Sequence, residues 1–494
     1  MTAVARVADV GTRSMAGLAV PAVAGLHLVI GLLHVGSLDL WYDEGYTAEA
    51  VQLPLRDLLS MLTRVDVNMS AYYGLLDGWT HLFGTSPVSL RLPSLLMTTA
   101  TVLLVGHLLT RWFGTVAGVV GATALGLSPF FLTVAVTARS YAMLALLTTV
   151  ALAAFVEALG STRFTPWALL AVVDLAALYA SPMAALTVLT QGLYVLFIDR
   201  RFHWAQLGAS AIMCLGLVPS LLYRSSSDPL SWRVPPTLGE ALGVVYGTVG
   251  WRAGIAVAAL ALVGVVLRPR PLGGRLTAHP RSRLLLPAFL VVPTTVMFAL
   301  LPWQSLFTQR YLTTFFISLT MLAAAATTTL SPRWGVAAAM VVLVSCVAGV
   351  VLRFVPQPGF IREDWSAATS RLDQVIEPGD AVVFTSPFVR VVGEYYGRSA
   401  RFTRVGQPRL PATPWNVEPP DTYDALDRSD RFLDPAVIQQ GLDGVRRAWL
   451  VAGSDDEALT RDTSALSDSG WRMADEERFP GLVLRLMTRP VAPS

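Results

Sequence analysis

Long apolar runs separated by short polar segments fill the first 355 residues of the chain. Most of the runs have the length of a helix that crosses a bilayer. Two runs, 166–181 and 183–198, are short and meet at Ser181-Pro182, so a single broken hairpin is the alternative there. The pattern predicts about eleven transmembrane spans, near 15–37, 89–110, 114–136, 140–159, 166–181, 183–198, 205–223, 251–267, 284–302, 311–330 and 333–353.

The segments between these runs also carry structure. The loop at 38–88 contains two stretches with helical apolar spacing, 47–62 and 71–83, and we expect both to lie as helices in the membrane interface. The Ser- and Pro-rich loop at 223–250 either covers a site or is a plain connector. The first run is longer than the apolar part of a cleavable signal peptide, so we expect it to be a signal anchor.

Charged residues become frequent after about Val355, and the apolar segments become short. Helical spacing alternates with short runs typical of buried strands, which favours a small α/β domain. The Pro-rich stretch 404–420 is expected to be a loop. The expected helices are 364–375 and 388–396, and the expected strands are 380–385, 448–452 and 482–487. The fold class predicted is a polytopic α-helical membrane protein, residues 1–355, with a small C-terminal α/β domain, residues 356–494.

Composition agrees with a membrane protein. The chain is 53% hydrophobic and 14% charged, with a mean hydropathy of +0.54, whereas a soluble domain carries about 25% charged residues. The net charge is only +3 and the basic residues, none of them lysine, form no stripe, so nucleic-acid binding is not expected. Cys214 and Cys346 lie inside apolar runs and are interpreted as small hydrophobic residues.

The distribution of arginine in the short loops predicts the orientation of the chain. With the N-terminus inside, arginines gather in the inner loops, above all at 268–283, and most loop carboxylates lie outside. We therefore expect a multi-pass plasma-membrane protein with the 38–88 loop and the C-terminal domain on the extracytoplasmic side. The isolated residues His27, His34, His81 and His107 are not spaced as metal ligands.

Two carboxylates stand at the outer boundary of the first span, in Trp41-Tyr42-Asp43-Glu44-Gly45. Charged groups at such a position are costly and point to function. In an extended segment, neighbouring side chains point opposite ways. We therefore expect Asp43 to face the reacting centre, and Glu44 to pair with an arginine or orient the loop. The pair alone is a weak candidate for a metal site, because hard cations take more oxygen ligands than two carboxylates supply.

Two arginines lie at the same predicted membrane surface. Arg139 lies at the outer end of the third span and Arg310 at the outer end of the ninth. Each is either a snorkelling side chain or a ligand of a phosphate group. One acid and two arginines at one surface suit an anionic, lipid-linked substrate and an acceptor hydroxyl. Further candidates for lining the site or binding an acceptor are Asp66, Asn68, Tyr72, Tyr141 and Tyr311. Asn68 or Ser70 could instead cap the helix that follows, and for Ser70 the cap is the favoured interpretation.

Six short motifs in this order resemble the GT-C glycosyltransferases, specifically the family 39-like protein mannosyltransferases and their bacterial relatives. They are Trp41-Tyr42-Asp43-Glu44, Asp66 to Tyr73 with Leu75, Leu76 and Trp79, Leu82-Phe83-Gly84 with Ser89-Leu90-Arg91-Leu92-Pro93-Ser94, Ala138-Arg139-Ser140-Tyr141, Gln309-Arg310-Tyr311-Leu312, and Arg362-Glu363-Asp364-Trp365.

The resemblance implies transfer of a monosaccharide from a polyprenyl phosphate, with inversion, on the outer face of the membrane. It implies Asp43 as general base, with Glu44 beside it, and Arg139 and Arg310 as ligands of the donor phosphate. Relatives often have His-Pro-Pro-Leu at 68–71 and Glu at 137, and these departures leave the acceptor and any metal dependence open. No cofactor is certain, and a divalent metal is possible but not favoured.

The function predicted is therefore a membrane glycosyltransferase. Mannose is the first candidate sugar and arabinofuranose the next, since the lysine-free, Ala-rich composition is typical of a high-GC actinobacterium. The acceptor would be a cell-envelope glycan, a glycolipid or a secreted protein. The alternatives are a transporter or flippase of lipid-linked sugars, which would favour internal repeats and charges near the middle of the membrane, and a non-catalytic envelope scaffold.

Overall fold

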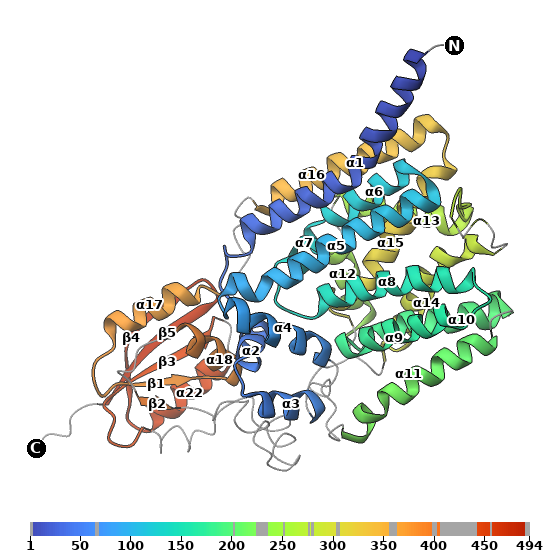
Figure 1. Ribbon diagram of the computed structural model, residues 1–494. Coiled ribbons are helices and arrows are strands. Elements are labelled where there is room, and N and C mark those ends of the chain that lie inside the picture. Colours follow the sequence, from blue (N-terminus) through green and yellow to red (C-terminus); the bar gives the residue numbers. More distant parts are fainter. Residues whose placement is uncertain are drawn as a thin grey trace, which may run out of the picture.

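The computed structural model has a bundle of helices with a small α/β domain at one end (Figure 1). It describes residues 3–64, 69–200, 203–223, 236–249, 252–274, 277, 281–302, 307–354, 363–397, 403–405, 442–454 and 457–489. The predicted boundary between the two parts, at 355/356, lies outside these ranges. The predicted separation into a helical part and a small C-terminal sheet is confirmed.

Each predicted apolar run contains helix. The helices of the bundle are α1 (Ala3–His34), α5 (Pro87–Phe113), α6 (Thr115–Gly126), α7 (Pro129–Ala135), α8 (Tyr141–Leu159), α9 (Thr165–Ala180), α10 (Ala184–Leu193), α11 (His203–Tyr223), α12 (Leu238–Val249), α13 (Arg252–Leu267), α14 (Leu285–Ala299), α15 (Thr313–Ala326) and α16 (Pro332–Phe354). Helix α10 continues in a π-helical turn, Tyr194–Ile198.

Among the described residues, fewer helices than the eleven predicted are long and apolar enough to be complete spans. In the described part of the chain, five helices are long and apolar enough to cross a membrane, or up to seven if each of two bent pairs is one span. One bent pair is α6 and α7, which meet at 66°. Ser128 caps α7 and Pro129 begins it, so the run predicted at 114–136 is broken there. The prediction of about eleven spans is not confirmed.

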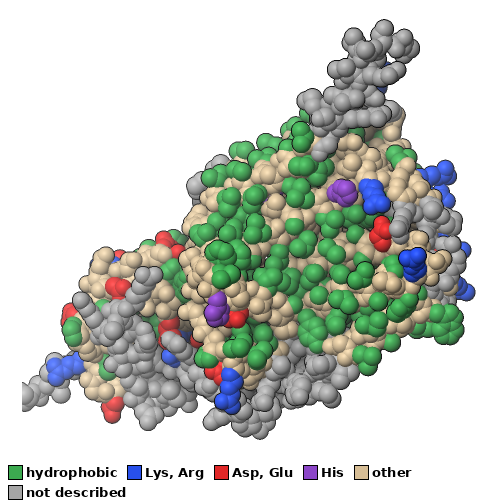
Figure 2. Space-filling view, in the orientation of Figure 1, with side chains coloured by type: hydrophobic (Ala, Val, Ile, Leu, Met, Phe, Trp, Pro, Cys, Tyr) green, Lys and Arg blue, Asp and Glu red, His purple; other side chains and the backbone are tan. Residues whose placement is uncertain are grey.

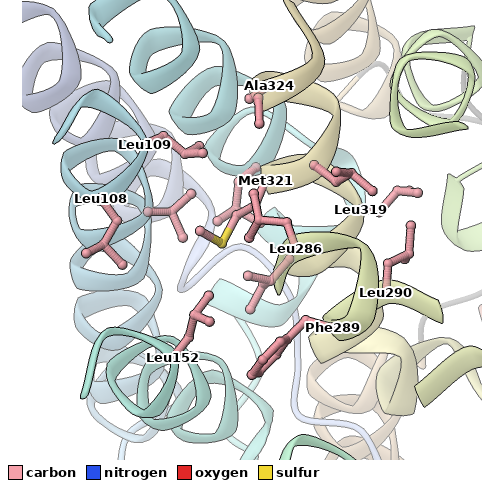
Figure 3. Close-up of a cluster of buried hydrophobic side chains, with 14 of the residues drawn as sticks. Leu108, Leu109, Leu152, Leu286, Phe289, Leu290, Leu319, Met321 and Ala324 are labelled. Carbon is pink, nitrogen blue, oxygen red and sulfur yellow. The ribbon is translucent and has the colours of Figure 1, made fainter. Parts of the chain in front are cut away.

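The main core lies between the helices of the bundle. In Figure 3, side chains from α5, α8, α14 and α15 point toward one another, among them Leu109, Leu152, Phe289 and Met321. On the face shown in Figure 2, hydrophobic side chains cover the middle of the bundle, and charged ones lie toward its ends. An apolar belt of this kind is what a membrane-embedded bundle presents to lipid.

The loop before α5 forms three short helices, α2 (Tyr42–Ala50), α3 (Leu55–Arg64) and α4 (Ser70–Phe83). The single helix predicted at 47–62 is wrong, because Pro54 lacks a backbone N–H and the chain turns before α3. The helix predicted at 71–83 is confirmed as α4. Its N-cap is Met69 with no side-chain cap, so the prediction that Ser70 caps it is wrong.

In its described residues, the C-terminal domain contains a five-stranded mixed sheet and three helices. Its strands are β1 (Ala381–Phe384), β2 (Thr403–Val405), β3 (Arg447–Gly453), β4 (Arg472–Phe479) and β5 (Leu482–Thr488), in the order β2-β1-β3-β5-β4. Strand β1 runs parallel to β2 and β3, and β5 runs antiparallel to β3 and β4. The helices are α17 (Trp365–Val375), α18 (Pro387–Tyr396) and α22 (Glu457–Asp468).

The predicted strands at 380–385, 448–452 and 482–487 and the helices at 364–375 and 388–396 are confirmed. Strands β2 and β4 and helix α22 were not predicted. Strand β4 is an edge strand rich in charged residues and largely exposed, so it lacks the apolar alternation by which a strand is recognised. Strand β2 is the start of the segment 404–420, which was expected to be a loop, and the rest of that segment lies outside the described residues.

The domain and the helices α2–α4 lie at the same end of the bundle (Figure 1). We expect this end to face away from the cytoplasm. A cysteine introduced at Ser454, in the C-terminal domain, should react with a membrane-impermeant maleimide in intact cells. A cysteine at Thr162, in the exposed turn between α8 and α9, should react only after the cells are opened. Labelling of Thr162→Cys alone in intact cells would invert this orientation.

Candidate active site

The acidic motif begins helix α2. Trp41 is its extended N-cap residue, with φ −100° and ψ 174°, so Asp43 and Glu44 lie in the first helical turn. The backbone N–H of Trp41 donates to Glu44 Oε2 at 3.5 Å, which closes the turn from the N-terminal side. The prediction of an extended segment is wrong here. Neighbouring positions on a helix also diverge, however, and the two carboxylates have different surroundings.

Glu44 is buried and pairs with an arginine. Arg91 Nε donates to Glu44 Oε1 at 2.8 Å, and Arg91 Nη2 donates to Glu44 Oε2 at 2.6 Å. Both side chains are 1% exposed. Oε1 also accepts the backbone N–H of Ala138 at 2.7 Å, just before Arg139. Glu44 therefore joins α2 to α5 and to the start of α8, as the orienting role predicted for it requires.

Arg91 satisfies all five of its N–H donors. Besides Glu44, it donates from Nη1 to the carbonyls of Val35 at 3.0 Å and Leu38 at 2.6 Å, and from Nη2 to that of Asp39 at 2.9 Å. These carbonyls follow the last turn of α1, where a cation also favours the negative end of the helix dipole. One guanidinium thus fixes the whole connection from α1 to α2.

Asp43 is partly exposed and faces Arg310. Asp43 Oδ2 accepts a hydrogen bond from Arg310 Nη1, and the two side chains are 26% and 27% exposed. The Arg310 guanidinium lies 5.1 Å from the centre of the Trp41 ring, which is a cation–π arrangement. Arg310 comes from the 3₁₀ turn Gln309–Leu312 that precedes α15, so two segments 267 residues apart meet at this carboxylate.

Arg139 holds the same turn of α2 from the other side. Its Nη1 donates to the Asp43 carbonyl at 3.3 Å, to Thr47 Oγ1 at 3.4 Å and to the Tyr73 hydroxyl at 3.2 Å. Thr47 Oγ1 in turn donates to the Asp43 carbonyl at 3.0 Å. Arg139 therefore contacts the backbone of the acidic turn, whereas Arg310 contacts the Asp43 carboxylate.

A cavity of about 520 Å³ opens beside Arg310 and extends into the bundle. Arg310, Trp41 and Tyr141 line its outer part. Deeper in the bundle the wall is mostly apolar and comes from α6, α7, α13, α15 and α16, with Phe130, Phe316 and Cys346 among its residues. Such a volume, apolar with a few polar groups, is typical of a site for a small organic ligand.

The loop at 223–250 contributes to this cavity. Residues 224–235 lie outside the described part, but the end of α12 (Gly247, Thr248 and Val249) lines the cavity wall. Gly247 brings the backbone close to the adjacent turn, because an added Cβ would lie 2.6 Å from Gln309 Nε2. Of the two interpretations of this loop, its described end supports the one in which it covers a site.

Comparisons with known proteins find solved structures that resemble this chain over most of its length. The family described as dolichyl-phosphate-mannose-protein mannosyltransferase matches residues 71–223. The structure of ArnT from Cupriavidus metallidurans in the apo state is similar over 94% of this chain and 97% of that chain, with a TM-score of 0.64 and 16% identity. ArnT bound to undecaprenyl phosphate gives a TM-score of 0.62, 15% identity and the same coverage.

A mycobacterial arabinofuranosyltransferase, AftD, is similar over 95% of this chain and 41% of that chain, with a TM-score of 0.50 and 17% identity. No curated protein matches the sequence. The predicted resemblance is confirmed. The chain has the GT-C fold.

The GT-C fold places the three candidate tyrosines differently. Tyr141 lines the cavity, and its ring centre lies 6.3 Å from that of Tyr311. Tyr72 is fully buried in α4, away from the cavity wall, and burial raises the pKa of its hydroxyl. The neighbouring Tyr73 is the one that contacts Arg139. Asp66, Asn68 and residues 303–306 lie outside the described part of the chain.

Several residues of this candidate site were not predicted to belong to it. Arg91 carried a signal, since an arginine just inside an apolar helix is costly and needs partners. Thr47 and Tyr73 carried none, because hydroxyl residues at a helix surface are common. Within the described residues no group of three His, Cys, Asp or Glu side chains is placed to hold a metal ion. His27 is satisfied by Gly126 O at 2.7 Å and Thr98 Oγ1 at 3.0 Å, as predicted for an isolated histidine.

Proposed function

We propose that this protein is a membrane glycosyltransferase that moves a monosaccharide from a polyprenyl-phosphate donor to an acceptor hydroxyl, with Asp43 as general base. The observation that carries the proposal is the Asp43–Arg310 ion pair, whose arginine lines a mostly apolar cavity. A lipid-linked sugar phosphate needs this combination, a cation for the phosphate and an apolar wall for the lipid. The descriptions of the similar proteins name a dolichyl phosphate and undecaprenyl phosphate, which supports a donor of this class.

In this proposal Arg310 binds the donor phosphate. Arginine suits a phosphate because its planar fork donates two parallel hydrogen bonds. The phosphate competes with the Asp43 carboxylate for the same guanidinium, so donor binding loosens the ion pair. An aspartate released from an arginine is the stronger base, and the base therefore becomes active when the donor is in place.

The transfer step then follows. Asp43 takes the proton of the acceptor hydroxyl while the acceptor oxygen forms a bond to the anomeric carbon. The bond from that carbon to the phosphate oxygen breaks, and the electron pair leaves with the polyprenyl phosphate. Arg310 stabilises the negative charge that develops on the leaving oxygens. Attack from the face opposite the phosphate inverts the anomeric configuration.

The proposal extends to the sugar and the acceptor. Mannose is the first candidate sugar, since the matching family is described by mannose transfer, and arabinofuranose is the next, since AftD is described as an arabinofuranosyltransferase. The acceptor is an envelope glycan, a glycolipid or a secreted protein on the outer face of the plasma membrane. No metal takes part in the steps above.

Substitution of Arg310 and of Arg139 should change different kinetic parameters. Arg310→Ala should raise the KM for the donor about 10- to 100-fold, because hydrogen bonds to a charged group contribute about 1.5–3 kcal/mol each. Arg310→Lys should recover only part of this loss, since lysine lacks the planar fork. Arg139→Ala should lower kcat more than it raises the KM, because Arg139 contacts the turn that carries Asp43.

The assay is transfer of radiolabelled sugar from a polyprenyl-phosphate donor in membranes with equal amounts of each variant. Arg478→Ala, which removes an exposed arginine of the C-terminal domain, is the matched control. A normal donor KM for Arg310→Ala would show that the phosphate binds elsewhere. It would leave the cavity without its proposed ligand.

A further inference from the structure

Helix α2 packs against the C-terminal domain as well as against the bundle. Its partner there is α18, and the two helices form one of the larger contacts between the two parts of the protein. A single apolar cluster extends from Ala48 and Ala50 in α2 through Val389 and Val392 in α18 to the sheet. The helix that carries Asp43 therefore shares its core with a domain more than 300 residues away in the sequence.

Gly45 is the point of closest approach in this contact. A Cβ added to Gly45 would lie 2.6 Å from Val392 Cγ2 and 3.2 Å from Val391 Cγ1. Real Cβ atoms do not come as close as 2.6 Å to another heavy atom. Val392 is fully buried, and a β-branched side chain in a helix has essentially one χ1 rotamer, so it cannot turn away. An added methyl group at position 45 must therefore move the backbone of α2 or α18.

Hydrogen bonds fix both sides of this contact. The Leu40 N–H donates to the Tyr396 hydroxyl at 2.9 Å, at the end of α18. The Tyr395 hydroxyl donates to the Thr85 carbonyl at 2.7 Å. Asp39 accepts from the backbone N–H and the hydroxyl of Ser366 in α17, each at 2.6 Å. Because the segment before α2 and the two domain helices are held in this way, the domain cannot slide to relieve a clash at Gly45.

We propose that Gly45 is a positioning residue, through which the C-terminal domain sets the place of Asp43 in the active site. The proposal rests on the proposed function, in which Asp43 is the base. Gly45 lies two residues after Asp43 in the same helical turn, so a shift of α2 at Gly45 moves the Asp43 carboxylate with it. A misplacement of about 1 Å can reduce turnover about 10²-fold.

The experiment is a cycle of four proteins: wild type, Gly45→Ala, Val392→Ala and the double variant. Gly45→Ala should lower kcat for sugar transfer at least about tenfold and change the donor KM less, because Arg310 comes from the turn before α15 and not from α2. Val392→Ala removes the methyl group that an alanine at position 45 would meet at 2.6 Å, and leaves the milder approach of Val391 Cγ1 at 3.2 Å. The double variant should therefore recover most of the lost kcat, which a general loss of stability would not allow. Gly78→Ala, an exposed glycine of α4 with open space around it, is the matched control.

Two outcomes overturn the proposal. One is a kcat for Gly45→Ala equal to that of Gly78→Ala. The other is a loss in Gly45→Ala that the second substitution fails to reverse, since the effect would then not pass through Val392. Asp43→Asn, assayed in membranes prepared in the same way, distinguishes failure of this proposal from failure of the proposed function. If Asp43→Asn transfers sugar normally, the assignment of the base fails. The contact itself is still tested by the same cycle in thermal unfolding, where the two substitutions should show coupling.

Discussion

Replacing Asp43 by asparagine should lower the rate of sugar transfer by about 10²–10⁴-fold, the usual contribution of a positioned general base. Asparagine keeps the shape of the side chain and can still accept a hydrogen bond from Arg310, but it cannot take a proton. The amount of protein and its thermal stability should change little, because the Asp43 side chain is only partly buried. Donor binding should not weaken, since Arg310 loses a competing carboxylate.

Asp77→Asn is the matched control for this prediction. Asp77 lies in α4 of the same loop and pairs only weakly with His81, at 3.7 Å. Both variants are assayed in membranes with radiolabelled donor at equal protein amounts. Transfer by Asp43→Asn at the rate of Asp77→Asn would remove Asp43 from the mechanism and leave the base to be sought at Asp66, which lies outside the described residues.

The second large effect should be on stability. Arg91→Met should lower the free energy of unfolding by about 3–5 kcal/mol, because it leaves the buried Glu44 carboxylate without its cation. It also removes the donors that reach the carbonyls of Val35, Leu38 and Asp39. Activity should fall with stability, since the connection from α1 to α2 is no longer fixed.

Arg371→Met is the comparison for this prediction. Arg371 pairs with Glu477 at 2.6 Å, but the two side chains are 39% and 40% exposed, so the loss should be about 0–1 kcal/mol. Both losses are measured by unfolding the purified variants in detergent with denaturant or heat. An equal loss of unfolding free energy in the two variants would mean that the Glu44–Arg91 pair does not fix the connection from α1 to α2.

The sequence predicts much of this fold because apolar runs and strand-like segments depend on local pattern. Helices α1, α5, α8 and α16 and strands β1, β3 and β5 follow directly from it. The number of spans does not, because the length of a run does not show where a helix bends. At Ser128-Pro129 a capping serine and a proline turn one run into two helices.

The site was predictable only in its charged members. Asp43, Arg139 and Arg310 are visible as charges at the edges of apolar runs. Their mutual arrangement depends on which segments meet in space, which the sequence does not show. The sequence therefore carries no sign that Arg139 contacts the α2 backbone whereas Arg310 contacts the Asp43 carboxylate. Gly45 is the last residue of the acidic motif identified in the sequence. Its role depends on Val392, and nothing in the local pattern around residue 45 indicates that partner.

The contact between α2 and the C-terminal domain also has a consequence for biosynthesis. Asp39 and its partner Ser366 are 327 residues apart, and Leu40 and Tyr396 are 356 apart. At about 5–20 residues per second, the ribosome needs roughly 15–70 s to make the chain between them. During that interval the helix that carries Asp43 has been made, but its supporting surface has not. The nascent chain therefore completes this contact only after α1 to α16 have been synthesised.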